Sequence, residues 1–204
     1  IMAIKAANDK SMSNITALPS GVSAKSMILI STQTASTSST ISFTSGIDST
    51  YNEYVFKFIN IHSSGNNTDA KFLFNGSIDA GSNYNVTKTS THFSAYFGED
   101  GSDAELAYRT NDDFAQSTAF LNLTANGNND NDGNMGGWLK LFNPSSTTFV
   151  KHFIALTNTM HAQPANQNVY VGGYFNTTSD IDAVQFKFAA GTVDSGTIKM
   201  YGVV

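Results

Sequence analysis

The sequence predicts an all-β protein: an antiparallel β-sandwich of jelly-roll topology, preceded by an extended N-terminal arm. Short apolar segments alternate with turn-forming residues about every 8–15 residues, which is typical of such sandwiches. No segment keeps a helical period of apolar residues over three turns. Neither a change of composition nor an internal repeat divides residues 26–204, so we expect a single domain there, with about ten to twelve strands.

The arm is expected at residues 1–25, which carry few large apolar side chains and show no sustained period. It either lies on another surface or is a frayed terminus without a role. This segment also lacks the apolar stretch of a secretory signal. The side chains that would anchor the arm to a partner are its scattered apolar residues, Ile4, Ile15, Leu18 and Val22.

The first strands are expected at residues 27–34 and 40–44, with Ile41 and Phe43 pointing inward. The longest dense apolar run, residues 46–62, predicts the central strand. Its apolar side chains fall on both parities, with Tyr54, Phe56 and Phe58 on one and Val55, Ile59 and Ile61 on the other. Because successive side chains of a strand point to opposite faces, we expect this strand to be buried on both faces.

Further strands are predicted between residues 70 and 124. In residues 70–75, Phe72 and Phe74 share one face, and Asn75-Gly76 is a signal for a tight turn. Residues 84–97 contain either one long strand or two, and weaker strands are expected at residues 104–109 and 119–124. A long polar loop follows at residues 126–134.

The C-terminal half alternates more clearly. Strands are predicted at residues 137–142 and 148–156, the second of them central. Residues 169–175 contain Gly172-Gly173, which indicates a bulge or a close approach of two backbones. In the strands at residues 183–188 and 197–203 the alternation points five side chains inward: Val184, Phe186, Phe188, Ile198 and Met200.

Composition excludes several classes of function. The chain has no cysteine, so disulfides, zinc–thiolate sites and cysteine nucleophiles are ruled out. Charged residues make up 13% and the net charge is −5, which predicts no binding to nucleic acid or to anionic membranes. No window of about 18 apolar residues predicts a transmembrane helix.

Candidate residues for metal or acid–base chemistry are few. Asn128–Gly133 resembles the start of an EF-hand loop, but Leu139 stands where the closing Glu of such a loop is required. An EF-hand is therefore rejected. Two alternatives are left, a looser Ca²⁺ site at Asp130 and Asp132 or a solvated loop that binds no metal. No pair of histidines has metal-ligand spacing, and we interpret His152 as structural. Glu53 is the best candidate for a catalytic acid, yet an outward position is the simpler interpretation. We therefore expect neither an enzyme nor a cofactor.

Trp138 is the one tryptophan of the chain, and its position decides between two hypotheses. We favour packing in the core or at a subunit interface, where its large apolar area is buried. An exposed Trp138 would instead be a platform on which a sugar ring stacks.

Four segments of the sequence resemble a known family: residues 11–21, 41–62, 141–153 and 173–203. They resemble virion-type proteins encoded by marine tailed bacteriophages, and residues 195–203 are similar to the last strand of many phage β-modules. The resemblance implies a structural protein of the particle, and it brings no catalytic residues. Absence of disulfides suits a protein made in a reducing cytoplasm.

The leading hypothesis is a capsid decoration (cement) protein located in the virion, made in the host cytoplasm and released by lysis. It would form a homotrimer and bind the major capsid protein or other virion proteins, with residues 1–25 crossing between capsid subunits. The alternative is a tail-fibre or receptor-binding module that recognises host glycans through Trp138 and the loops at residues 98–103 and 126–134. A polysaccharide depolymerase is disfavoured because no acid pair stands out.

Overall fold

The computed structural model describes residues 26–65 and 70–204, and every regular element in these residues is a β-strand. The predicted arm, with Ile4, Ile15, Leu18 and Val22, lies outside the described residues. The strands are β1 (Met27–Thr34), β2 (Ile41–Phe43), β3 (Glu53–Ser63), β4 (Phe72–Ser77), β5 (Lys88–Gly98), β6 (Ala104–Tyr108), β7 (Phe114–Ser117), β8 (Leu121–Asn122), β9 (Met135–Phe142), β10 (Lys151–Met160), β11 (Ala165–Phe175), β12 (Ala183–Phe188) and β13 (Val193–Val203).

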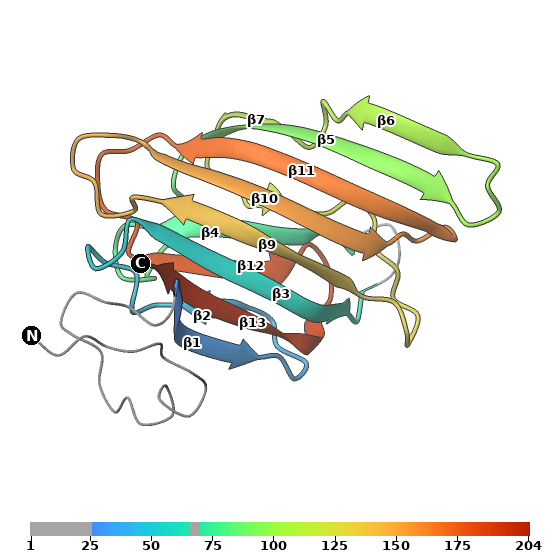
Figure 1. Ribbon diagram of the computed structural model, residues 1–204, viewed down its shortest axis with the longest axis horizontal. Helices are drawn as coiled ribbons and strands as arrows, with labels where there is room; N and C mark the ends of the chain where they lie inside the picture. Colours follow the sequence, from blue (N-terminus) through green and yellow to red (C-terminus); the bar gives the residue numbers. More distant parts are fainter. Residues whose placement is uncertain (1–25, 66–69) are drawn as a thin grey trace, which may run out of the picture.

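Two antiparallel sheets of unequal width pack against each other (Figure 1). The large sheet has nine strands in the order β1-β13-β3-β9-β10-β11-β5-β6, with β7 also paired to β5. The small sheet has the order β2-β12-β4-β8. The predicted all-β sandwich is therefore confirmed, whereas the jelly roll is not confirmed, because a jelly roll divides eight strands between two sheets.

The core lies between the two sheets and is built largely from phenylalanine. Phe186 of β12 is fully buried at its centre. Its ring lies 5.5 Å from that of Phe56 and 5.3 Å from that of Phe58, both on β3 of the opposite sheet. Within its own sheet it stacks on Phe72 at 5.7 Å. The predicted inward positions on β2, β12 and β13 are confirmed. Each side chain that was expected to point inward is buried: Ile41, Phe43, Val184, Phe186, Phe188, Ile198 and Met200.

The central strand β3 is buried on both faces over only part of its length. Val55 is buried, as predicted, but Ile59 is 41% exposed. A bulge follows Phe58, where Asn60 has a positive φ of 51°, and it turns Ile61 back into the core. Gly196 makes room for this bulge, because a Cβ there would lie 2.5 Å from the carbonyl oxygen of Asn60. The prediction that Ile59 and Ile61 share a buried second face is wrong for this reason.

Asn75 and Gly76 do not form the predicted turn but lie inside β4. The buried Asn75 amide donates hydrogen bonds to the carbonyl oxygens of Tyr84 and Thr118. The chain turns a few residues later, where Ala80 and Gly81 have positive φ values of 57° and 83°. The side-chain amide of Asn75 thus donates hydrogen bonds to buried carbonyl oxygens of neighbouring loops, and Asn75 does not initiate a hairpin.

Gly173 confirms the predicted close approach of backbones on β11. A Cβ at this position would lie 2.6 Å from the carbonyl oxygen of Thr89 on β5. The pairing of β11 with β10 and with β5 runs without a register shift there, so the close approach involves no bulge.

The large sheet is wider than the small one. In Figure 1, β6 and the adjoining ends of β5 and β11 extend past the small sheet at the upper right. Strand β7 was missed by the sequence patterns, because its four residues, FAQS, show no apolar alternation. It pairs with β5 at Lys88 and Ser90, whereas β6 pairs with Phe93–Phe97 of the same strand.

The fully buried position of Phe186 predicts a large loss of stability when its side chain is truncated. Phe186→Ala removes a ring that packs against both sheets, and we expect the free energy of unfolding to fall by about 3–5 kcal/mol. The matched control is Phe93→Ala, whose ring is 41% exposed on the outer side of the large sheet and should cost much less. Chemical denaturation of both variants measures the difference; equal losses would contradict the central role of Phe186.

Candidate functional site on the outer face of the large sheet

The outer face of the large sheet, the side turned away from the small sheet, carries a continuous row of large side chains. Strand register sets these residues directly opposite one another on five neighbouring strands: Trp138 (β9), Leu156 (β10), Tyr170 (β11), Phe93 (β5) and Tyr108 (β6). We call this set the aromatic row. Because strands lie about 4.8 Å apart, it spans about 19 Å. Its members on β11, β5 and β6 are all exposed.

Two rings of the aromatic row, Phe93 and Tyr170, present their edges to solvent. Phe93 and Tyr170 stack on each other with centroids 4.9 Å apart and planes inclined by only 4°. That separation matches the spacing of neighbouring strands, so the two rings stand upright and cover each other's faces. Upright apolar edges suit packing against another protein better than the flat stacking of a sugar.

Trp138 lies on the outer face of the large sheet. A position in the core, which was one of the predicted alternatives, is therefore wrong. Trp138 is half-buried, and Lys140 Nζ lies 5.7 Å from the centre of its ring. Lys57 and Leu156 flank it in register on β3 and β10. Its outward position is compatible with both remaining predictions, a subunit interface and a glycan site.

Lysines accompany the aromatic row on the side of β3 and β13. Lys57 and Lys199 stand directly opposite each other, and Lys57 Nζ lies 5.5 Å from the ring centre of Tyr201. Neither lysine forms an ion pair with a described residue. Lys140, by contrast, pairs with Glu53 at 2.8 Å, so the outward position expected for Glu53 is confirmed and this carboxylate is used in an ion pair.

The predicted Ca²⁺ loop shows no ligand cluster. Asp130 and Asp132 are both exposed. The loop is held instead by backbone contacts: the Asp130 carbonyl oxygen accepts from Gly133 N at 2.7 Å and lies 3.1 Å from His62 Nε2. Within residues 26–65 and 70–204, no three His, Asp or Glu side chains converge as metal ligands would.

His152 is exposed on the outer face, where its ring meets the edge of Tyr174 at 5.9 Å. Burial does not support the interpretation of His152 as a structural histidine, because its side chain is exposed. Its neighbour on this face is Ile154, which is also exposed. Both residues extend the apolar surface beside the aromatic row.

Strand β5 inverts the usual pattern, because its polar side chains face inward. Lys88, Ser90, His92 and Ser94 are buried, while Phe93 on the opposite parity is exposed. The Lys88 ammonium donates to the carbonyl oxygens of Val86 at 3.1 Å and Ala119 at 2.6 Å. Burial lowers the pKa of Lys88 from 10.5 to about 7.

No protein-family model, curated protein or solved structure matches this chain. Nor does any helix in the described part of the chain have the length and apolarity needed to span a membrane.

Only Trp138 among the members of the aromatic row was singled out from the sequence. The other four lie on strands far apart in the chain, and no local pattern places them together. The signal in the sequence was the alternation in β5, where Phe93 and Phe97 share one parity and polar residues such as His92 and Ser94 occupy the other. The sequence could not say which of these two sets faces outward; in the structure His92 and Ser94 are buried.

The buried Lys88 predicts that stability depends on pH. Its folded-state pKa, about 7, lies below its unfolded value of 10.5, so between these values only the unfolded chain holds the proton. Raising the pH from about 7 to 10 should therefore stabilise the fold, by at most about 1.4 kcal/mol per pH unit. In Lys88→Met this contribution should vanish.

Urea denaturation at several pH values between 6 and 10 measures this slope. Lys57→Met, which removes an exposed lysine from the outer face, is the matched control and should keep the slope of the unmodified protein. Equal slopes for Lys88→Met and the unmodified protein would rule out titration of Lys88 as the cause.

Proposed function

We propose that the protein is a structural protein of a phage particle that decorates the capsid, as a homotrimer, and strengthens it by binding across coat subunits. The observation that carries the proposal is the aromatic row on the outer face, which no described part of the chain covers. Large apolar patches on a soluble surface commonly mark sites of protein association. The resemblance to phage virion proteins supplies the class of particle.

The charges of the outer face indicate the chemistry of the partner surface. The chain as a whole has a net charge of −5, yet Lys57 and Lys199 stand together on this face without a described acidic partner. A coat-protein surface with an apolar patch beside acidic side chains would complement it. Residues 1–25 would add a second contact by crossing to a neighbouring subunit.

The proposal is tested with the double variant Phe93→Ser/Tyr170→Ser. It removes the stacked rings at the middle of the aromatic row, and we expect binding to purified capsids lacking the protein to weaken at least tenfold. The rings are exposed, so the fold should survive. Phe149→Ser is the matched control, because this phenylalanine is 68% exposed in the loop between β9 and β10 and lies off the row.

Co-sedimentation with the capsids measures binding of each variant. If the double variant binds as well as Phe149→Ser, the outer face is not the capsid contact. A truncation lacking residues 1–25 tests the arm separately. Unchanged binding by that truncation would refute the clasp and leave the face as the sole contact.

The alternative function, recognition of host glycans by a tail-fibre or receptor-binding module, is favoured by the outward position of Trp138. It predicts that a glycan array detects binding by the unmodified protein and that Trp138→Ala abolishes it while the thermal unfolding midpoint hardly changes. Trp138→Phe, which keeps an aromatic face, is the control and should retain part of the signal. An array without hits would contradict this alternative.

A further inference from the structure

One histidine on the inner side of β5 is buried without a hydrogen-bond partner. His92 has no exposed surface, and neither of its ring nitrogens makes a hydrogen bond with a described residue. A neutral imidazole ring leaves one donor and one acceptor unsatisfied at this position. A protonated ring would bring a charge and two unsatisfied donors into the same buried space, which costs far more. The site therefore accepts the neutral ring and disfavours the charged one.

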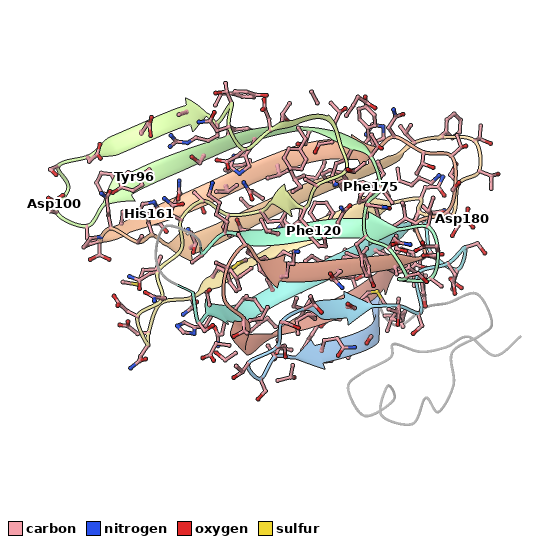
Figure 2. The ribbon with its side chains drawn as sticks, turned by 180° about the vertical axis from the view of Figure 1, so that it is seen from behind. Tyr96, Asp100, Phe120, His161, Phe175 and Asp180 are labelled. Carbon is pink, nitrogen blue, oxygen red and sulfur yellow. The ribbon has the colours of Figure 1, made fainter. Side chains whose placement is uncertain are left out.

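His92 lies at a junction in the edge of the large sheet. Strand β6 pairs with residues 93–97 of β5, and β7 pairs with residues 88 and 90, so His92 stands between the two, opposite the turn that joins them. The backbone of the turn is bonded to the histidine itself, since Arg109 N donates to His92 O at 2.8 Å. Figure 2 shows this edge from behind, with β6 at the upper left. Among the described strands, β6 pairs with β5 alone.

A buried carboxylate ties the turn to the small sheet. Asp112 Oδ1 accepts hydrogen bonds from Lys71 Nζ at 3.0 Å and from Asn122 Nδ2 at 2.6 Å. Lys71 directly precedes β4, and Asn122 is the last residue of β8. Together with Arg109, Lys71 and Asp112 also line a polar hollow of about 330 Å³ on the inner side of the large sheet. Solvent therefore lies next to these charged groups, while the ring of His92 stays buried.

The surroundings of His92 set the sign of its response to pH. Burial has the largest effect and holds the pKa of the ring below its ordinary value of 6.5. Of the charged groups around the ring, Asp112 and Asp113 act in the opposite direction and raise the pKa. Lys71 and Arg109 lower it further. When water surrounds the ring, its pKa returns toward 6.5, so between the two values only an opened form holds the proton, and a falling pH favours opening.

We propose that His92 is the trigger of an acid-sensitive latch: when its ring takes up a proton, β6 and the turn at residues 109–113 detach from β5, and they return when the proton leaves. A protonated ring competes with the two present donors for the carboxylate of Asp112, which weakens the tie to the small sheet. Opening also admits water to both ring N–H groups. Because β6 carries Tyr108, opening removes one member of the aromatic row from the outer face. The latch does not depend on the capsid proposal.

Hydrogen exchange of the full chain, followed by mass spectrometry at pH 7.5 and at pH 5, tests the latch. After correction for the intrinsic exchange rate at each pH, the protection of amides in residues 104–113 should fall about fivefold or more at pH 5, since one titrating group changes the opening equilibrium by up to about tenfold per pH unit. Protection should recover on return to pH 7.5. Amides of β3 and β9 should stay better protected at pH 5, because the opening is local.

His92→Leu removes the titrating ring without the loss of a side-chain hydrogen bond. The variant should keep the protection of residues 104–113 at pH 7.5 and should lose the response to acid. The matched control is His161→Gln, because the pKa of His161 is also lowered, by burial and then by Arg109. This control should respond to acid as the unmodified protein does.

NMR of the histidine ring nitrogens in the unmodified protein is a second measurement, which needs no buried substitution. The signals of His92 should change over the same pH interval as the protection of β6. Four results would overturn the proposal: equal protection of residues 104–113 at both pH values, an acid response that persists in His92→Leu, loss of the response in His161→Gln, or protonation of His92 without any change in β6.

Discussion

The packing of phenylalanine rings around Phe186 is the constraint on which the other features of the molecule depend. Phe186 comes from the small sheet, and Phe56 and Phe58 come from the large one, so this contact decides where the two sheets meet. A four-stranded sheet centred there cannot cover all of a nine-stranded one. Beyond its edge, the inner side of β5 and β11 must be covered by loops or be polar.

The polar interior of β5 follows from that mismatch of widths. Near the core, Lys88 is accommodated because two backbone carbonyl oxygens accept hydrogen bonds from its Nζ atom, and burial lowers its pKa. Further along the strand, Ser94 accepts hydrogen bonds from Arg109 and from Gln167 of β11, and both of these residues border a polar hollow. Buried polar groups are retained in folded proteins when they have partners, and the two carbonyl oxygens that accept from Lys88 are such partners.

The aromatic row and the polar hollow lie on opposite sides of the large sheet. The aromatic row is on the outer face, whereas Tyr96, Glu105 and Gln167 point inward because their parity is opposite to that of Phe93 and Tyr108. A protein that docks on a capsid through the outer face would thus keep the hollow turned away from the contact. Substitutions on different parities of the same strands therefore change one face of the large sheet without changing the other.

The sequence by itself determined the all-β class, most strand positions and the inward side chains of β12 and β13, because alternation along a single strand is a local property. Local alternation does not say which parity faces the core when both carry large or polar side chains, as in β5. It also could not predict the bulge at Asn60, which redirects Ile61. The tertiary structure alone decided that Trp138, Tyr170 and Phe93 form one row and that Gln167 borders a hollow, because both depend on the register between strands that are distant in the chain.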